Sequence, residues 1–276
     1  MASSIRQAVG RAVKVTAATV DRLRAPSSGV VFLLYHRVGR RSSSEVDLDA
    51  GVFSAQMAFL AESTEVLRLH EALPQLAEPA TATRRRPAVV VTFDDGTDDF
   101  VDVAVPILER HGIPATLYLA TAFVEDGVAY PDGGRPASWS GLADACATGL
   151  VDIGSHTHRH RLLDRLPEPE IADELDRSIA LVEEHLGRAA VDFAYPKAVF
   201  GSPAADDAVR RRFRSAAIAG THANAYGRTD PYRLARSPIQ VGDAMTYFRH
   251  KVAGGMGFED TMRRAANRVR YAGLRS

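Results

Sequence analysis

The stretch VVVTFDDG, Val89–Gly96, decides the fold together with GSHTHRH, Gly154–His160. The first is an apolar run typical of a β-strand that ends in two adjacent carboxylates and a glycine. The second places His156 and His160 four residues apart, just after another short apolar run. One carboxylate and two imidazoles form a ligand set that leaves coordination positions open, as catalytic zinc sites do. The two stretches therefore predict a hydrolase.

The length and composition of the chain indicate a globular α/β protein. Its 276 residues suffice for one large domain, and 46% are hydrophobic and 25% charged, as in ordinary soluble proteins. No apolar run is long enough to span a membrane, and charges interrupt residues 1–24, where a signal peptide needs an apolar core. We therefore expect a cytoplasmic location. The single cysteine, Cys146, excludes an intramolecular disulfide and is interpreted as a small buried residue.

The net charge is zero, but the charge is unevenly distributed. Residues 1–25 carry five basic side chains and one acidic one, and residues 259–276 carry five basic and two acidic ones. The two ends thus have charges of +4 and +3, and the part between them has −7. We expect three regions: a basic amphipathic helix or extension over residues 1–28, one domain over 29–258, and a basic helix over 259–276.

The N-terminal helix has a predicted apolar face, formed by Ile5, Val9, Ala12, Val13, Thr16, Val20 and Leu23. A basic helix of this kind can bind peripherally to an anionic membrane surface. Alternatively, it docks on the domain and keeps its charges in water. Nucleic acid is not an expected partner, because the body of the chain is acidic and lacks a recognisable reader motif.

Strand-like and helix-like segments alternate along most of the chain. The strand-like runs are Val30–Tyr35, Ala88–Phe93, Ala115–Ala120, Leu150–Ile153, Val191–Tyr195, Ser215–Ala219 and Arg233–Val241. The helix-like stretches include Phe53–Ser63, Asp98–His111, Trp139–Thr148, Glu168–Leu186 and Ala204–Arg212. Such alternation predicts parallel strands joined by right-handed crossovers. Without a glycine-rich dinucleotide fingerprint, it favours a closed or nearly closed barrel, whose chemistry gathers at the carboxyl ends of the strands.

The predicted site residues follow strand-like runs and suit hydrolytic chemistry. Two adjacent aspartates diverge, so that one can bind a cation while the other accepts a proton from water. Gly96 permits the tight turn that Asp94 and Asp95 require. Ser155 is expected to cap a helical turn that brings the two histidines onto one face. Each signal is weak alone, but together they form a consistent pattern.

The ordered segments TFDDG (Thr92–Gly96), SHTHRH (Ser155–His160) and FAYP (Phe193–Pro196) resemble the first three motifs of the polysaccharide deacetylase family, the NodB-homology domain of carbohydrate esterase family 4. The segments LLYHRVG (Leu33–Gly39) and YRLARSPI (Tyr232–Ile239) are similar to segments of bacterial members tied to exopolysaccharide synthesis. The resemblance covers roughly residues 30–255.

This resemblance implies a deformed (β/α) barrel of about seven parallel strands and a divalent metal, usually Zn²⁺, with Co²⁺ or Ni²⁺ as alternatives. It implies that Asp95, His156 and His160 bind the metal and that Asp94 is the general base. The backbone N–H of Lys197 would stabilise the oxyanion. Tyr195 and Pro196 of the third motif are expected to line the substrate site.

The chain departs from the family pattern in three places. Ala194 stands where many members have an arginine that pairs with the base. The fourth motif, with its aspartate and tryptophan, is not evident. The leucine-x-histidine segment that supplies the general acid is missing as well, and His222 is the best substitute by position.

Two further residues have both a functional and a structural interpretation. Trp139, the only tryptophan, either stacks on a sugar or packs against the protein. His36, which follows the strand Val30–Tyr35, either faces the substrate pocket or is a buried histidine bonded to backbone. His158, between the two ligand histidines, is expected to point away.

We therefore expect a metal-dependent hydrolase that removes acetyl groups, N-acetyl above all, from a sugar of a surface polysaccharide or its lipid-linked precursor. The first alternative is a catalytically impaired carbohydrate-binding or scaffold protein on the same barrel. The second is a hydrolase of a non-sugar amide, because the metal and the base do not by themselves select the acyl carrier.

Overall fold

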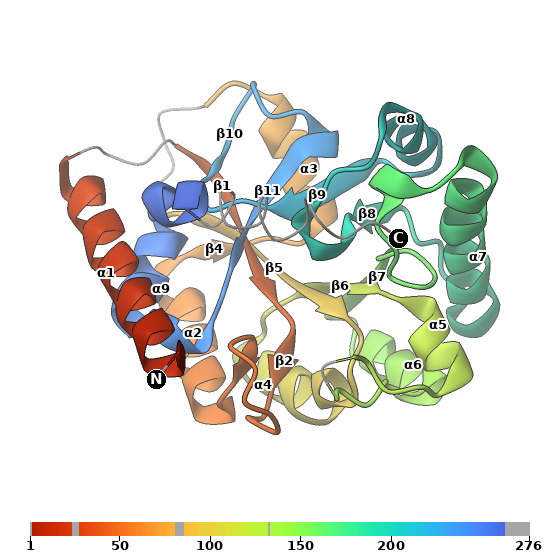
Figure 1. Ribbon diagram of the computed structural model, residues 1–276, viewed down its shortest axis with the longest axis horizontal. Coiled ribbons are helices and arrows are strands. Elements are labelled where there is room, and N and C mark those ends of the chain that lie inside the picture. Colours follow the sequence, from red (N-terminus) through yellow and green to blue (C-terminus); the bar gives the residue numbers. More distant parts are fainter. Residues whose placement is uncertain (1, 24–27, 81–85, 132, 263–276) are drawn as a thin grey trace.

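Parallel strands close into a barrel in the computed structural model, which describes residues 2–23, 28–80, 86–131 and 133–262 (Figure 1). Within these residues the ring has seven strands and runs in the order β1, β5, β6, β7, β8, β9, β11 and back to β1. Their bounds are Gly29–Tyr35, Ala88–Asp95, Ala115–Leu119, Val151–Ser155, Asp192–Ala194, Ser215–Ala219 and Leu234–Pro238. The predicted barrel of about seven parallel strands is confirmed.

The barrel is uneven around its circumference. Strands β1 and β5 pair over six positions, whereas a single register pair, Ser155 with Phe193, joins β7 to β8. Short strands extend the sheet: β4 (Glu65–Val66) pairs with the start of β5, and β10 (Asn224–Ala225) runs antiparallel to the start of β1. A separate pair, β2 (Arg37–Val38) and β3 (Asp47–Leu48), follows the end of β1. The predicted deformation therefore lies mainly at the β7–β8 seam.

Helices cover the outside of the barrel (Figure 1). Those in the described residues are α1 (Ala2–Leu23), α2 (Ala50–Ser63), α3 (Leu69–Ala77), α4 (Val105–His111), α5 (Thr121–Asp126), α6 (Trp139–Ala147), α7 (Glu168–Leu186), α8 (Pro203–Arg212) and α9 (Ala244–Val252). The stretch predicted as one helix over 98–111 begins with a π-helical turn, Phe100–Ala104, before α4. The predicted strand Arg233–Val241 is shorter, because Pro231–Arg233 and Val241–Asp243 are 3₁₀ turns.

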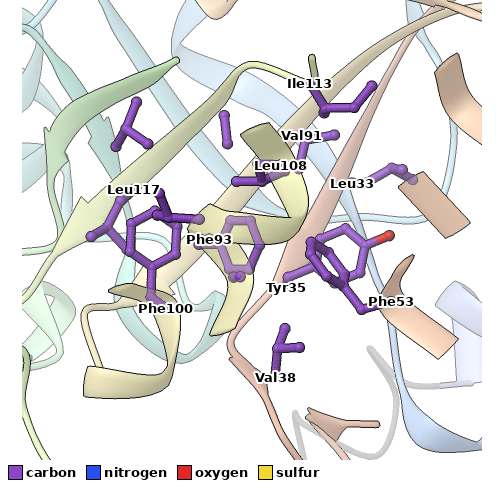
Figure 2. Close-up of a cluster of buried hydrophobic side chains, with 14 of the residues drawn as sticks. Leu33, Tyr35, Val38, Phe53, Val91, Phe93, Phe100, Leu108, Ile113 and Leu117 are labelled. Carbon is purple, nitrogen blue, oxygen red and sulfur yellow. The ribbon is translucent and has the colours of Figure 1, made fainter. Parts of the chain in front are cut away.

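Alternate residues of the strands pack on opposite sides of the barrel wall. On β1 and β5, Leu33 and Val91 join a cluster with residues of α2 and α4, whereas Phe32 and Val90 join one with residues of α3. Because both sides are buried, these strands have near-continuous apolar sequences. Figure 2 shows the cluster that includes residues of α2 and α4. In it, the rings of Tyr35 and Phe93 stack with centroids 5.3 Å apart. Cys146 is also buried, as expected, and burial raises the pKa of its thiol.

Helix α1 packs against α9 (Figure 1), and the described part of the predicted apolar face is only partly buried. Among the described side chains of α1, Lys14 and Ala17 are buried and Val13 and Val20 of the predicted face are half-buried, whereas Ala12 and Thr16 of that face are exposed. The reason lies in ion pairs between α1 and the end of the chain, which periodicity in α1 alone does not reveal. Residues 257–262 are helical, and the rest of the predicted C-terminal helix, 263–276, lies outside the described residues.

Among the described helices, none combines the length and the apolar character that a membrane span requires.

Candidate metal and catalytic site

The register of three strands brings the two sequence motifs to one end of the barrel. Asp95, the last residue of β5, pairs with Leu119 of β6, which pairs with Ser155, the last residue of β7. His156 follows directly and continues the pairing, because its backbone N–H donates to the Leu119 carbonyl. Since the strands are parallel, Asp95 and His156 lie at the carboxyl ends where barrel enzymes place their chemistry.

The structure brings Asp95, His156 and His160 together. One side-chain atom from each lies within 4.8 Å of the other two. The Asp95 Oδ1 atom is 3.8 Å from His156 Nε2 and 3.5 Å from His160 Nε2. In a tetrahedral zinc site, bonds of about 2.1 Å place the donor atoms about 3.4 Å apart. The three side chains therefore fit a Zn²⁺-like ion with a coordination position to spare.

Unusual backbone conformations make this convergence possible. Asp95 has φ 76° and Gly96 has φ 101°, which confirms that the turn after the two aspartates needs a glycine. Thr157 and His160 also have positive φ values, 66° and 56°. The predicted helical turn between the histidines is therefore wrong, because these two residues leave the helical region. Ser155 Oγ does accept the Thr157 N–H over 3.2 Å, but it supports a non-helical turn and does not cap a helix as predicted.

Hydrogen bonding fixes which nitrogen of His156 faces Asp95. Its Nδ1 lies 2.8 Å from the backbone carbonyl of Ala194, so a protonated Nδ1 donates there and Nε2 keeps its lone pair. Burial lowers the pKa of His156 to about 4, against the opposing effect of Asp94. A neutral imidazole with a directed lone pair is what a cation requires from this residue.

Asp94 is buried beside the ligand set and held by Arg236. The Arg236 guanidinium binds both carboxylate oxygens, with N–O distances of 2.5 and 2.8 Å. Burial acts to raise the pKa of Asp94, but Arg236, with smaller contributions from His156 and His36, outweighs it and lowers the pKa to about 2. Asp94 is therefore ionised at neutral pH.

Arg236 is a candidate site residue that sequence reasoning missed. The family arginine is absent at Ala194, and Arg236 supplies the guanidinium from β11 instead. It is 1% exposed, and its guanidinium also lies over the Tyr118 ring, 4.8 Å from the centroid. The signal available in the sequence was the segment YRLARSPI, in which Arg236 interrupts a strand-like run.

His36 lies next to Asp94. Tyr35, the last residue of β1, pairs with Phe93 of β5, so His36 follows β1 at the level of Asp94, the penultimate residue of β5. His36 is half-buried, and its Nδ1 is buried without a hydrogen-bond partner among the described residues. Its position favours the functional interpretation over that of a histidine bonded to backbone.

The third motif contributes backbone more than side chains. Lys197 is exposed, with φ 53° and ψ 22°, and it follows the buried Pro196. Tyr195 turns away from the ligand set, because its ring packs among residues of α7 and α8 and its hydroxyl donates to Asp206 Oδ1 over 3.1 Å. We therefore no longer assign Tyr195 to the substrate-binding surface.

Three other residues considered in the sequence analysis do not join the group of candidate metal ligands. Trp139 stacks on His185 with centroids 4.3 Å apart, and its indole N–H donates to Glu125, which supports the packing interpretation. His222 lies exposed in the loop after β9. His158 is buried, with its Nδ1 3.0 Å from Thr121 Oγ1, and so points away from the ligands as expected.

Known proteins resemble this chain in sequence and in fold. The sequence model of the family described as "Polysaccharide deacetylase" matches residues 81–216. The uncharacterized protein YlxY of Bacillus subtilis (strain 168) is 24% identical over 115 residues, which are 42% of this chain and 32% of the relative. The chain thus spans about a third of the length of that curated relative.

Solved structures match over a longer range. IcaB from Ammonifex degensii is 27% identical with a TM-score of 0.70, over 83% of this chain and 97% of that one. The Streptococcus pyogenes deacetylase PplD, solved in complex with acetate, is 19% identical with a TM-score of 0.70, over 82% and 99% of the two chains. The chain belongs to the polysaccharide deacetylase family, a class of hydrolases that act on carbon–nitrogen bonds other than peptide bonds.

Proposed function

We propose that this protein is a divalent-metal-dependent deacetylase that removes N-acetyl groups from a sugar of a surface polysaccharide or its lipid-linked precursor. The observation that carries the proposal is the convergence of Asp95, His156 and His160 beside the buried Asp94–Arg236 pair. We propose Zn²⁺ as the metal, with Co²⁺ or Ni²⁺ as substitutes, because one carboxylate and two imidazoles suit such ions.

The protein side chains divide the chemistry between them. Asp95, His156 and His160 would hold the cation, which when bound would polarise the acetyl carbonyl and lower the pKa of water. Asp94 accepts a proton from the water that attacks the acetyl carbon, and Arg236 holds the carboxylate in place for that transfer. The N–H of Lys197 donates to the oxygen that becomes negative in the transition state.

The departing amine needs a proton, and we assign that role to His36 rather than to His222. His36 follows the end of β1 at the level of Asp94 in β5, whereas His222 is exposed in a loop. Protonation of the leaving group matters more for an amide than for an ester of an acidic alcohol. A neutral amine leaves far more readily than an amide anion, whereas the anion of an acidic alcohol leaves without a proton. An acid beside the base therefore favours an amide substrate.

The two alternatives remain distinguishable. An impaired binding protein would lack a positioned base, but Arg236 restores the pairing that the loss of the third-motif arginine removed. A non-sugar amide hydrolase would share the same residues, so only a substrate panel separates it from a sugar deacetylase.

The first test uses metal-free protein reloaded with Zn²⁺ and measures acetate released from acetylated saccharides, lipid-linked sugars and simple acetamides. Asp94→Asn should keep stoichiometric metal while the rate falls by about two to four decades. His156→Ala and His160→Ala should lose metal and activity together. Asp98→Asn is the matched control, because Asp98 also forms ion pairs with arginines, Arg41 and Arg135, but is not one of the proposed site residues. Its turnover should remain unchanged. Unchanged turnover in Asp94→Asn would refute the assignment of the base.

The second test compares His36→Asn with His222→Asn on two substrates. His36→Asn should slow the hydrolysis of an N-acetyl sugar by about 100-fold or more, because the amine leaves without a proton. It should affect 4-nitrophenyl acetate much less, since nitrophenolate leaves without protonation. His222→Asn should change neither rate. An equal loss on both substrates in His36→Asn would assign this residue to substrate binding or structure instead.

A further inference from the structure

Helix α1 docks on the domain through polar contacts. Lys14 is buried, with its Nζ 2.5 Å from Asp243 Oδ1 and 2.5 Å from Glu259 Oε1. Asp21 accepts the N–H of Met256 over 2.8 Å and lies 3.3 Å from His250 Nδ1. These bonds join α1 to α9 and to the helical segment 257–262. The side of α1 that faces the protein is therefore the ionic one.

The opposite side of α1 is apolar and exposed to solvent. Its described residues are Ala12, Val15, Thr16 and Thr19, and Val15 is 52% exposed. Both threonine hydroxyls donate to carbonyls of the preceding turn, those of Ala12 and Val15, over 3.0 and 2.9 Å. Their methyl groups therefore add to the apolar character of this side of the helix.

The docked segments next to α1 expose more large apolar side chains. Phe258 and Met262, on the segment 257–262, are 38% and 45% exposed, and Val241 is 36% exposed. Lys14 and Glu259 form an ion pair, and each has one of these exposed apolar residues as its sequence neighbour: Val15 follows Lys14, and Phe258 precedes Glu259. With Val15 these residues are four of the seven large hydrophobic residues that are exposed in the described part of the chain. We name Val15, Val241, Phe258 and Met262 the terminal apolar face.

The charge of the chain indicates what covers this face. Besides Lys14, residues 1–25 and 259–276 contain nine arginines, whereas the rest of the chain carries a net charge of −7. An apolar face with cations in the adjoining sequence, on an otherwise acidic protein, suits an anionic bilayer surface. The acidic body would then be oriented away from the lipid.

We propose that the terminal apolar face docks this protein on anionic membranes, with Val15, Phe258 and Met262 inserted at the headgroup boundary and the basic charge of the terminal sequences adding electrostatic attraction. This inference concerns location and does not depend on the proposed chemistry. Docking would bring the barrel to membrane-anchored sugars, whichever acetyl group it removes.

The test is sedimentation of the full chain with vesicles of phosphatidylcholine alone or of phosphatidylcholine with phosphatidylglycerol. We expect strong binding to the anionic vesicles only and a loss of binding at high salt, since each basic residue near such a surface contributes about fivefold. The double variant Val15→Asp/Met262→Asp should reduce partitioning by about tenfold or more. Its activity on a soluble acetylated saccharide should remain unchanged.

The matched control is Val128→Asp, because Val128 is equally exposed, at 56%, but follows α5 on another part of the barrel (Figure 1). Circular dichroism and thermal melting verify that each variant folds, and Phe258→Ser replaces any that does not. No binding to anionic vesicles, equal binding to neutral ones, or an equal effect of Val128→Asp would overturn the proposal. Failure here leaves the deacetylase assignment intact, because that assignment is measured without lipid.

Discussion

At the scale of single residues, Arg236 determines how Asp94, the proposed base, is positioned. Both partners are almost fully buried, and two parallel N–H···O bonds fix the carboxylate plane. Removing one member of a buried ion pair typically costs about 3–5 kcal/mol, because the other charge is left without a partner. A conservative replacement is therefore the informative one.

We predict that Arg236→Lys lowers kcat/KM by about 10- to 100-fold while Zn²⁺ binding is retained. Lysine keeps the charge but cannot form the planar two-point contact, so Asp94 gains rotational freedom. The measurements are steady-state kinetics and metal content. Arg214→Lys is the control, because Arg214 forms a similar two-point contact with Asp192 away from the ligand set. If both variants behave alike, the contact of Arg236 has only a structural role.

At the scale of elements, α7 holds the loop that carries His160. Glu174 of α7 is fully buried, and its Oε2 accepts the backbone N–H of Arg159 over 2.7 Å. The backbone carbonyl of Glu174 accepts the N–H of His158 over 3.0 Å. One turn further along α7, Ser178 Oγ lies 2.6 Å from Ser155 Oγ. Helix α7 therefore fixes both ends of the turn that bears the two histidine ligands.

We predict that Glu174→Ala weakens Zn²⁺ binding by about 10- to 100-fold, because the loop loses the acceptor that holds the residue before His160. Glu174→Gln should restore most of the affinity, since an amide oxygen accepts the same N–H. Competition with a chelating dye measures the dissociation constant without any substrate. Glu184→Ala, at an exposed position on the same helix, provides the baseline. Equal affinity in all three variants would show that α7 does not position the ligands.

At the scale of the whole molecule, a buried ionic network joins the two ends of the described chain. Asp243, just before α9, contacts Lys14 of α1 and Lys251 of α9, and Glu259 contacts the same two lysines. Burial acts to raise the pKa of Asp243, but the two lysines outweigh it and lower the pKa below its usual 3.8. The network thus ties residues more than 200 positions apart in the sequence to one side of the barrel.

We predict that Asp243→Asn lowers the free energy of unfolding by about 3 kcal/mol and increases hydrogen exchange in α1, because two buried lysines lose a carboxylate. Since the pKa of Asp243 is lower in the folded state, its stabilisation is present above pH 3.8 and is lost as the pH falls through the folded value. Denaturant titrations at pH 7 and at a series of lower pH values measure both effects. The variant should differ from the wild type at pH 7 and converge with it in acid, whereas the exposed Asp207→Asn should match the wild type throughout.

The alternating apolar runs were sufficient to predict the barrel, because strands buried on both sides need near-continuous apolar sequences. The ligand set was predictable for a related reason: Asp95, His156 and His160 each follow a strand end, and the carboxyl ends of parallel strands meet at one edge. The helices α3, α5 and α9 were not predicted. Glu174 and Ser178 were missed because polar residues on a buried helical face do not stand out from periodicity alone.

The sequence by itself thus determined the alternation of strands and helices, the order of the motifs and the identity of the three candidate ligands. Only the tertiary structure decided that Arg236, 142 residues from Asp94, pairs with that carboxylate, that His36 lies beside it, and that ion pairs dock α1 on the domain. The physical reason is that these contacts depend on closure of the barrel between β1, β5 and β11 and on ion pairs between distant segments, and neither produces a periodic pattern in the sequence.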